Sequence, residues 1–451
     1  MATHHESLAI GYNYQDKTDL VQQAGLTVFA AGLLALLIPL WIGDDPAGRY
    51  FAWSGMLLAI GGLFAYFFRT YAKSPPGVKN NGIWLRASTS RGHIAWVTAV
   101  FLTGFYIVLY WFPAYLEGLI RATDGLSLGL RSKPADHWFV YGLFYTLAIL
   151  IMGGRALLKY RHSAYQLIRT VSVMFFQLGF AFLIPYLLQK LNEPEFYFSY
   201  FWPLKYDYLF PGTVWNLTHT PGALGIFMVF WTAVISLIGV PVLTYFFGKR
   251  WYCSWVCGCG GLAETAGDPY RHLSDKSRKA WRYEVAIIYP ILGFIVLVTA
   301  LLWLNSFLGG SLLGGISGSL AQAYGFFIGA IFSGVIGVGF YPVMGSRVWC
   351  RFGCPMAAYI GLFQKHFSRF RITTNGGQCI SCGNCSTYCE MGIDVRWYAQ
   401  QGQPIIRASC VGCGICATVC PRGVLNLENG PRENRYQPSN LISPENIRIL
   451  S

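Results

Sequence analysis

The sequence predicts an all-α polytopic membrane protein of about eight transmembrane helices, with a small cysteine-rich α+β module at its C-terminal end. Composition predicts the membrane part: of 451 residues, 54% are hydrophobic and only 12% are charged, which is far too apolar for an ordinary soluble protein. Cysteine spacing predicts the module, because two tandem four-cysteine motifs lie near the C-terminus.

Eight windows that lack Asp, Glu, Lys, Arg and His are long enough to cross a bilayer. A soluble protein would have to bury eight such runs as core helices, so we interpret them as membrane spans. They are, approximately, Ala24–Gly43, Phe51–Phe68, Ile94–Tyr115, Trp138–Gly154, Val171–Leu188, Ala223–Phe247, Val285–Leu304 and Ala321–Tyr341.

Basic residues predict the orientation, since lysine and arginine stay on the cytoplasmic side of short loops. If both termini lie inside, the inner segments hold most of the 34 basic residues, whereas the outer loop Asn305–Leu320 holds none. We therefore expect a multi-pass protein of the bacterial cytoplasmic (inner) membrane, with both termini and the cysteine-rich module in the cytoplasm. Met1–Gln23 shows no cleavable signal, so the first helix is expected to be an uncleaved anchor. The net charge of +14 reflects this bias along a membrane face, and we predict no nucleic-acid partner.

The two C-terminal motifs share the spacing C-x2-C-x2-C-x3-C, which is typical of bacterial two-cluster ferredoxins. In that arrangement the fourth cysteine of each motif binds the cluster of the other motif. Gly383 and Gly414 fall where the backbone must turn tightly around a compact cofactor. A zinc ribbon or a disulfide framework would not repeat this spacing of four cysteines. We predict two 4Fe–4S clusters, one held by Cys379, Cys382, Cys385 and Cys420, the other by Cys410, Cys413, Cys416 and Cys389.

An internal repeat with the pattern G-x-R-x-aromatic-C-x3-C follows the sixth and eighth spans. It contributes Cys253 and Cys257 in one copy, and Cys350 and Cys354 in the other. If each copy is helical, its two thiols share one face, so four thiols at the membrane edge would complete a further iron–sulfur or metal centre. Two structural cysteine pairs, oxidised or simply buried, are the alternative. Cys259 belongs to neither pair and is either a spare thiol or an alternative ligand.

The outer loop Leu191–Gly222 is crowded with aromatic residues. Such a loop is typical of an amphipathic segment lying in the membrane interface, and a quinone pocket wall is the sharper alternative. The spans contain no facing histidine pair for a haem. We divide the chain into an N-terminal membrane region of four spans (1–170), a membrane core of four spans with both C-x3-C motifs (171–370), a double 4Fe–4S ferredoxin domain (371–428) and a polar tail (429–451).

In its spans, its two C-x3-C motifs and its double ferredoxin, the segment Val171–Glu428 resembles the membrane-bound 4Fe–4S polyferredoxins. That family includes the quinol-dehydrogenase membrane subunit of periplasmic nitrate reduction (NapH-type), the nitrous-oxide-reductase maturation protein (NosR-type) and the cytochrome-oxidase copper-assembly protein (CcoG-type). Its members typically read C-x3-C-P in both membrane-edge motifs; here Cys354 keeps the proline, whereas Gly258 follows Cys257. The first ferredoxin motif likewise ends in Cys389-Glu390 rather than Cys-Pro.

The resemblance implies a membrane-bound electron-transfer protein that links the quinone pool, or a membrane partner, to a redox protein on the cytoplasmic side. We expect an electron-transfer subunit of an oxidoreductase rather than a stand-alone catalyst, because no nucleophile–base group or nucleotide fingerprint is visible. The alternatives are a metal-cofactor assembly factor of the copper-reductase type and a structural or redox-sensing subunit of a membrane complex. The eight methionines are scattered, which does not favour copper handling.

Overall fold

The computed structural model describes residues 19–42, 45–73, 89–314 and 316–430. The predicted polar tail therefore lies almost entirely outside the described residues. Helices of the first four spans and their connections are α1 (Leu20–Ala35), α2 (Pro39–Ile42), α3 (Pro46–Lys73), α4 (His93–Trp111), η2 (Pro113–Leu116), α5 (Glu117–Ala122), α6 (Asp124–Arg131) and α7 (His137–Lys159).

The membrane core follows. Its helices are α8 (Ala164–Phe175), η3 (Phe176–Leu183), α9 (Ile184–Lys190), η4 (Tyr206–Leu209), α10 (Pro211–Thr218), α11 (Leu224–Val234), η5 (Ile235–Gly239), α12 (Val240–Phe247), α13 (Arg250–Cys253), α14 (Gly258–Glu264), η6 (Asp268–Leu273), α15 (Arg278–Phe307), α16 (Ile316–Tyr324), η7 (Gly325–Ile336), α17 (Tyr341–Met344), η8 (Trp349–Gly353) and α18 (Pro355–His366).

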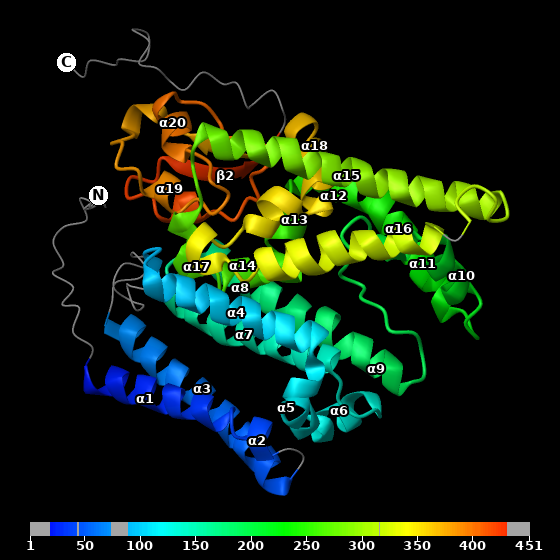
Figure 1. Ribbon diagram of the computed structural model, residues 1–451. Coiled ribbons are helices and arrows are strands. Elements are labelled where there is room, and N and C mark those ends of the chain that lie inside the picture. The colour runs from blue at the N-terminus through cyan, green and yellow to red at the C-terminus, as the bar shows by residue number, and fades with distance from the viewer. Residues whose placement is uncertain (1–18, 43–44, 74–88, 315, 431–451) are drawn as a thin grey trace, which may run out of the picture.

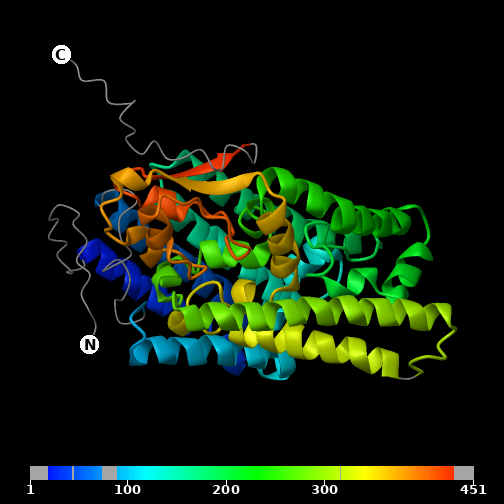
Figure 2. The ribbon, with the colours of Figure 1, turned by 90° about the horizontal axis from the view of Figure 1, so that it is seen from above.

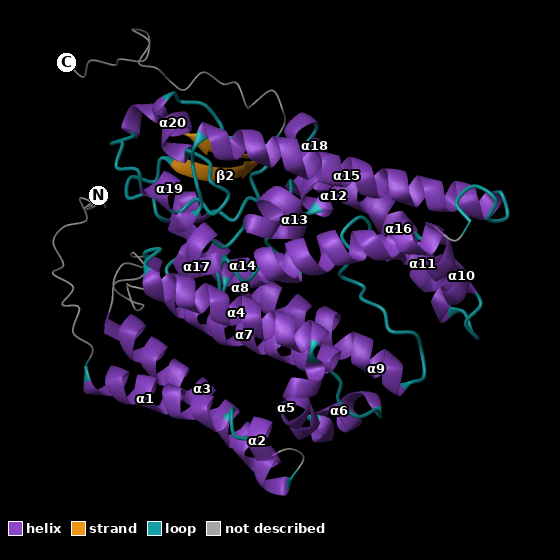
Figure 3. Ribbon diagram, in the orientation of Figure 1, coloured by secondary structure: helices purple, strands orange, loops and turns teal. Residues whose placement is uncertain are grey.

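The C-terminal module contains the only two strands in the described part of the chain (Figure 3). Its elements are β1 (Phe370–Thr374), η9 (Gly376–Gln378), α19 (Asn384–Thr387), α20 (Val395–Gln400), α21 (Ile415–Thr418) and β2 (Leu425–Asn429). The strands pair antiparallel, with Phe370 opposite Asn429 and Thr374 opposite Leu425, so they join the beginning of the module to its end. Figure 1 and Figure 2 both place the module at one end of the long helices.

Eight helical segments are long and apolar enough to cross a membrane, and each overlaps one predicted window. They are Leu20–Ile42, Pro46–Ala72, His93–Trp111, His137–Lys159, Ala164–Lys190, Leu224–Phe247, Arg278–Phe307 and Ile316–Ile336. The predicted mostly helical membrane fold, with a ferredoxin-like C-terminal region, is thereby confirmed.

Two of these helices extend beyond the charge-free windows and carry buried cations. Arg155 and Lys159 lie on α7, and Arg169 lies on α8. All three residues are at most 2% exposed. Each helix continues beyond its charge-free window, which ends at Gly154 in α7 and begins at Val171 in α8, into a region where carboxylates from other segments pair with the cations.

The first two spans pack closely through small residues. A Cβ on Gly32 would lie 2.4 Å from the backbone nitrogen of Ala59, and one on Gly62 would lie 2.5 Å from that of Phe29. Small residues let helix backbones approach where lipid supplies no hydrophobic driving force. Figure 1 shows this pair, α1 and α3, along one side of the bundle.

Three later spans contain π-helical stretches: η3, η5 and η7. Such stretches are rare and frequently mark functional sites. The aromatic loop Leu191–Gly222 is mostly inserted into the protein rather than laid along the interface. Phe196 and Phe201 are at most 5% exposed, whereas Trp215 is 64% exposed. Its rings pack against α11 and the cysteine-rich core, where aromatic side chains bury a large apolar area.

Candidate metal centres

The first ferredoxin motif and the last cysteine of the second motif surround one pocket. Its lining includes Cys379, Cys382, Cys385 and Cys420. This pocket is close to the surface, because its rim also includes Ile380, which is 49% exposed. The grouping is the one that the crossed-ligand rule predicts; actual ligation stays a prediction.

A second pocket is lined by the other four ferredoxin cysteines, Cys389, Cys410, Cys413 and Cys416. The apolar side chains around it are deeply buried, including Ile372, Met391 and Val411 at 1–3% exposure. The second group therefore lies in the interior, and the first lies at the edge of the module.

The two glycines predicted to lie at tight turns have the backbone conformation that such pockets require. Gly383 has φ of +80° and Gly414 has φ of +73°, a left-handed conformation that favours glycine. Each precedes a short helix, α19 or α21, that carries the third cysteine of its motif. The backbone can thus wrap around a compact object and place successive thiols on it.

The membrane-edge motifs also come together. Cys253, Cys257, Cys350 and Cys354 are all 5–6% exposed and belong to one buried cluster of the core. Cys354 interacts electrostatically with each of the other three, and Cys253 with Cys257 and Cys350. We call these four residues the membrane-edge group.

The local backbone explains why the two copies match. Each copy begins with a glycine of positive φ, Gly248 at +67° and Gly345 at +93°. In each, the second cysteine is the N-cap residue of the following helix: Cys257 precedes α14 and Cys354 precedes α18. The two cysteines of a copy therefore do not share one continuous α-helix, contrary to the helical arrangement considered from the sequence, because the chain turns between them.

The thiols are in surroundings that disfavour a bare thiolate. Burial raises the pKa of Cys253 to about 12 and the pKa of Cys410 to about 11. Clustered buried thiols deprotonate when a positively charged centre compensates the anions. The donor set therefore fits metal–thiolate centres.

Two buried cations flank the membrane-edge group. Arg347 is 1% exposed, and its Nη1 lies 3.6 Å from the Cys350 Sγ. Lys249 is also 1% exposed, and its Nζ donates to the Ala408 carbonyl oxygen at 3.2 Å. Lys249 interacts electrostatically with thiols of both neighbouring groups, Cys253 and Cys410. Among the residues that the structure describes, no carboxylate forms an ion pair with Lys249.

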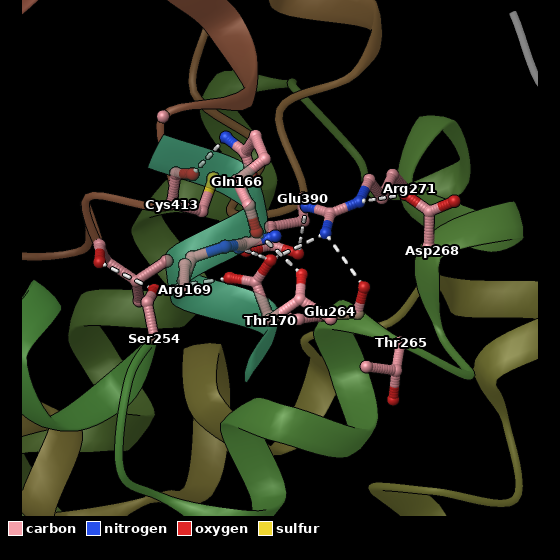
Figure 4. A network of polar contacts seen from close by, with 12 residues as sticks. Gln166, Arg169, Thr170, Ser254, Glu264, Thr265, Asp268, Arg271, Glu390 and Cys413 are labelled. Carbon is pink, nitrogen blue, oxygen red and sulfur yellow. Dashed lines mark hydrogen bonds and ion pairs between the residues drawn. The ribbon is translucent and has the colours of Figure 1, made fainter. Parts of the chain in front are cut away.

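Between the membrane-edge group and the second ferredoxin group lies a network of buried ion pairs (Figure 4). Glu264 is the hub of the network and forms ion pairs with three arginines. These are Arg169, Arg271 (2.7 Å) and Arg347 (2.5 Å). Glu390 pairs with Arg271 at 2.6 Å and with Arg347 at 2.9 Å. The glutamate that replaces the usual proline after Cys389 therefore has a structural role.

The network continues through Asp268. Its carboxylate pairs with Arg155 and Lys159 at 2.8 Å and accepts a hydrogen bond from the Tyr160 hydroxyl at 2.7 Å. Burial alone would raise the pKa of Asp268, but the neighbouring Lys159, Arg155 and Arg271 outweigh it and hold that pKa well below its usual value.

One oxygen from each of Glu264 and Glu390 lies within 4.8 Å of the Cys413 thiol. Both carboxylates are already paired with arginines, which would repel a metal cation. We therefore assign them to the ion-pair network. The sequence did not predict this network because most of its ion pairs join segments that lie far apart in the chain; only the unexplained Glu390 indicated it.

The second ferredoxin group is attached to the membrane core by hydrogen bonds to its backbone. Tyr165 donates to the Gly412 carbonyl at 2.8 Å, and Gln166 donates to the Cys413 carbonyl at 2.9 Å. From α18, Gln364 donates to the Cys410 carbonyl at 2.6 Å. These contacts hold this group next to the helices that carry the membrane-edge cysteines.

The thiol of Cys259 interacts directly with the Cys257 thiol of the membrane-edge group, and Cys259 also lines a cavity. The cavity has a volume of about 210 Å³ and is lined by Cys259, Cys350 and several aromatic residues. None of its lining residues comes from the loop Leu191–Gly222. The aromatic loop, which we considered from the sequence as one wall of a quinone pocket, therefore does not line this cavity.

Known 4Fe–4S binding domains match three parts of the chain. One family model, described as a 4Fe–4S binding domain, matches residues 229–281 and 324–373, which contain the two membrane-edge motifs. A second 4Fe–4S binding domain model matches residues 404–426, which contain the second ferredoxin motif. No solved structure matches the chain.

Two curated proteins are similar to part of the chain. YccM of Escherichia coli (strain K12), described as a proposed electron transport protein, is 26% identical over 187 residues, which cover 36% of this chain and 47% of YccM. The methylamine utilization ferredoxin-type protein MauN of Methylobacillus flagellatus (strain ATCC 51484 / DSM 6875 / VKM B-1610 / KT) is 25% identical over 166 residues, covering 35% of this chain and 54% of MauN. The chain thus spans about half the length of the curated relatives it matches.

Proposed function

We propose that this chain, which is similar to ferredoxin-type 4Fe–4S proteins over part of its length, carries electrons between quinone in the membrane and a redox protein at the cytoplasmic face. The observation that carries the proposal is the succession of three four-cysteine groups. The membrane-edge group lies among the helices, the second ferredoxin group is bonded to those helices, and the first lies near the surface.

The ferredoxin module is proposed to hold two 4Fe–4S clusters with exchanged fourth ligands. The first set is Cys379, Cys382, Cys385 and Cys420; the second is Cys389, Cys410, Cys413 and Cys416. Both sets are supported by the pockets that they line. When bound, a 4Fe–4S cluster with four thiolate ligands exchanges single electrons and has no open iron for a substrate.

The membrane-edge group is proposed to hold a third 4Fe–4S cluster, on Cys253, Cys257, Cys350 and Cys354. The family model that matches both motifs is a 4Fe–4S binding domain. Charge supports the same assignment, since buried Lys249 and Arg347 approach these thiols. Two disulfides would be neutral and would leave Lys249 without a negative partner in the described part of the chain, whereas a thiolate-bound cluster is anionic.

The redox protein is proposed to bind near the first ferredoxin group. Its rim residues Ile380, Arg396 and Arg422 are exposed, so a partner can approach the edge of this pocket. The distribution of lysine and arginine supports a position of this face, and of both termini, on the cytoplasmic side of the inner membrane. We propose no bond-making chemistry for the chain itself.

Mixing the dithionite-reduced full-length protein with menadione tests the quinone half of this proposal. We expect the visible absorbance of the iron–sulfur protein to return to the oxidised form as menadione is reduced. If that absorbance fails to respond at any ratio of quinone to quinol, the link to quinone is wrong and an assembly or structural role takes its place.

A further inference from the structure

We propose that the 210 Å³ cavity beside Cys350 binds the head group of a quinone. This inference rests on the quinone half of the proposed function and adds where the ligand binds and through which residues. The cavity lies between the N-terminal spans α4 and α7 on one side and η7, α17 and η8 on the other.

The lining is built from aromatic rings. Tyr106 and Tyr110 are stacked at 5.6 Å on α4, and Trp138 meets Tyr110 edge-on at 5.0 Å. Tyr141 adds an edge-on contact with Tyr106 at 6.0 Å. Such surfaces favour a flat, conjugated ring over water, since aromatic pairs prefer stacked or edge-to-face geometry.

Two buried polar groups on this lining have no partner. The indole Nε1 of Trp349 and the hydroxyl of Ser346 make no hydrogen bond to any described residue, although the two residues are only 7% and 1% exposed. A buried unpaired polar group costs about 1–3 kcal/mol, so a hydrogen-bond acceptor that reaches either group from the cavity would be stabilised. An indole N–H and a hydroxyl are donors suited to the carbonyl oxygens of a quinone.

Size and position restrict the ligand further. Sites for drug-sized ligands are about 300–1,000 Å³, so this smaller cavity accommodates one or two fused rings and not an isoprenoid tail. Trp138, a lining residue on a transmembrane helix, is 48% exposed. The lining also includes Cys350, a residue of the membrane-edge group. A quinone here would have its ring beside that group and its tail in the membrane.

The cavity also gives the N-terminal spans a role. The rings from α4 and α7 lie outside the segments that match the 4Fe–4S binding domain, whereas Trp349, Ser346 and η7 lie inside them. Gly334 of η7 allows the two parts to meet, because a Cβ there would come within 2.1 Å of the Tyr106 ring. We infer that the first spans complete the quinone site.

Binding of menadione to the full-length protein, measured by quenching of tryptophan fluorescence and by equilibrium dialysis, tests the assignment. Trp349→Phe and Ser346→Ala each remove one donor and keep most of the side-chain shape, so each is expected to weaken binding about two- to tenfold. Trp215→Phe, in the aromatic loop, is the matched control and is expected to bind as the wild type does. Iron content equal to wild type shows that each variant is folded around its centres.

Photolabelling of the wild type with an azido-naphthoquinone provides a readout that needs no variant. We expect menadione-competed label on peptides from α4 or α7. Competed label confined to Leu191–Gly222, or unchanged menadione affinity in both donor variants, would overturn the site and leave the proposed function standing. A wild type that binds no menadione would overturn both.

Discussion

At the scale of single residues, charge around the cysteine groups decides what they can hold. Lys249 is almost fully buried and interacts with thiols of both the membrane-edge group and the second ferredoxin group. A buried cation is costly unless a negative charge lies near it. We therefore regard Lys249 as part of the electrostatic environment of two centres.

Removing that charge is expected to change reduction potentials. Reduction adds negative charge to a centre, and a nearby ammonium stabilises the added charge. Lys249→Met should therefore shift the membrane-edge centre, and to a smaller extent its neighbour, to lower midpoint potential in a redox titration followed by electron paramagnetic resonance. Lys279→Met removes an exposed lysine on α15 and should leave the potentials unchanged. Equal potentials in the Lys249 variant and the wild type would disprove the role.

Glu264 is the residue whose loss should destabilise the fold most clearly. It is 2% exposed and pairs with three arginines, so Glu264→Gln leaves buried guanidinium groups without their carboxylate. Breaking a buried pair in this way typically costs about 3–5 kcal/mol. Thermal unfolding followed by circular dichroism should show a large drop in melting temperature.

Glu117→Gln is the control for that experiment. Glu117 pairs with Arg121 at 3.6 Å, the two side chains are 66% and 42% exposed, and exposed pairs contribute about 0–1 kcal/mol. Similar melting temperatures for the two variants would contradict the view of Glu264 as the hub of the network.

At the scale of elements, the ferredoxin motifs are predicted to exchange their last cysteines. If they do, Cys389→Ser alters the same cluster signal as Cys413→Ser, and Cys420→Ser alters the same signal as Cys382→Ser. Electron paramagnetic resonance of the four reduced variants separates the pairs. Should Cys389→Ser instead match Cys382→Ser, each motif keeps its own four cysteines.

Sequence predicts such elements well where the signal is local. The apolar windows predicted the eight spans, and the cysteine spacing predicted the two groups of four cysteines that line the ferredoxin pockets. The sequence did not predict contacts between residues that are distant in the chain. Nothing near Arg155 indicates that Asp268 lies beside it. Likewise, Tyr106 looks like any interfacial aromatic residue until η7 packs against it.

At the scale of the whole molecule, the proposed orientation rests on the distribution of basic residues. The account predicts that alkaline phosphatase fused after Ser451 is inactive and that green fluorescent protein fused there is fluorescent in a bacterial host. Active phosphatase at this position would place the first ferredoxin group on the outer face and would exclude a cytoplasmic partner.

The central claim is that three cysteine groups hold three 4Fe–4S clusters in one chain. Iron and acid-labile sulfide measured on anaerobically purified, full-length protein test it most directly. We predict about twelve iron atoms per chain, falling to about eight in Cys350→Ser while the signals of the ferredoxin clusters persist. About eight iron atoms in the wild type, unchanged in Cys350→Ser, would contradict the claim and leave the membrane-edge group without a cluster.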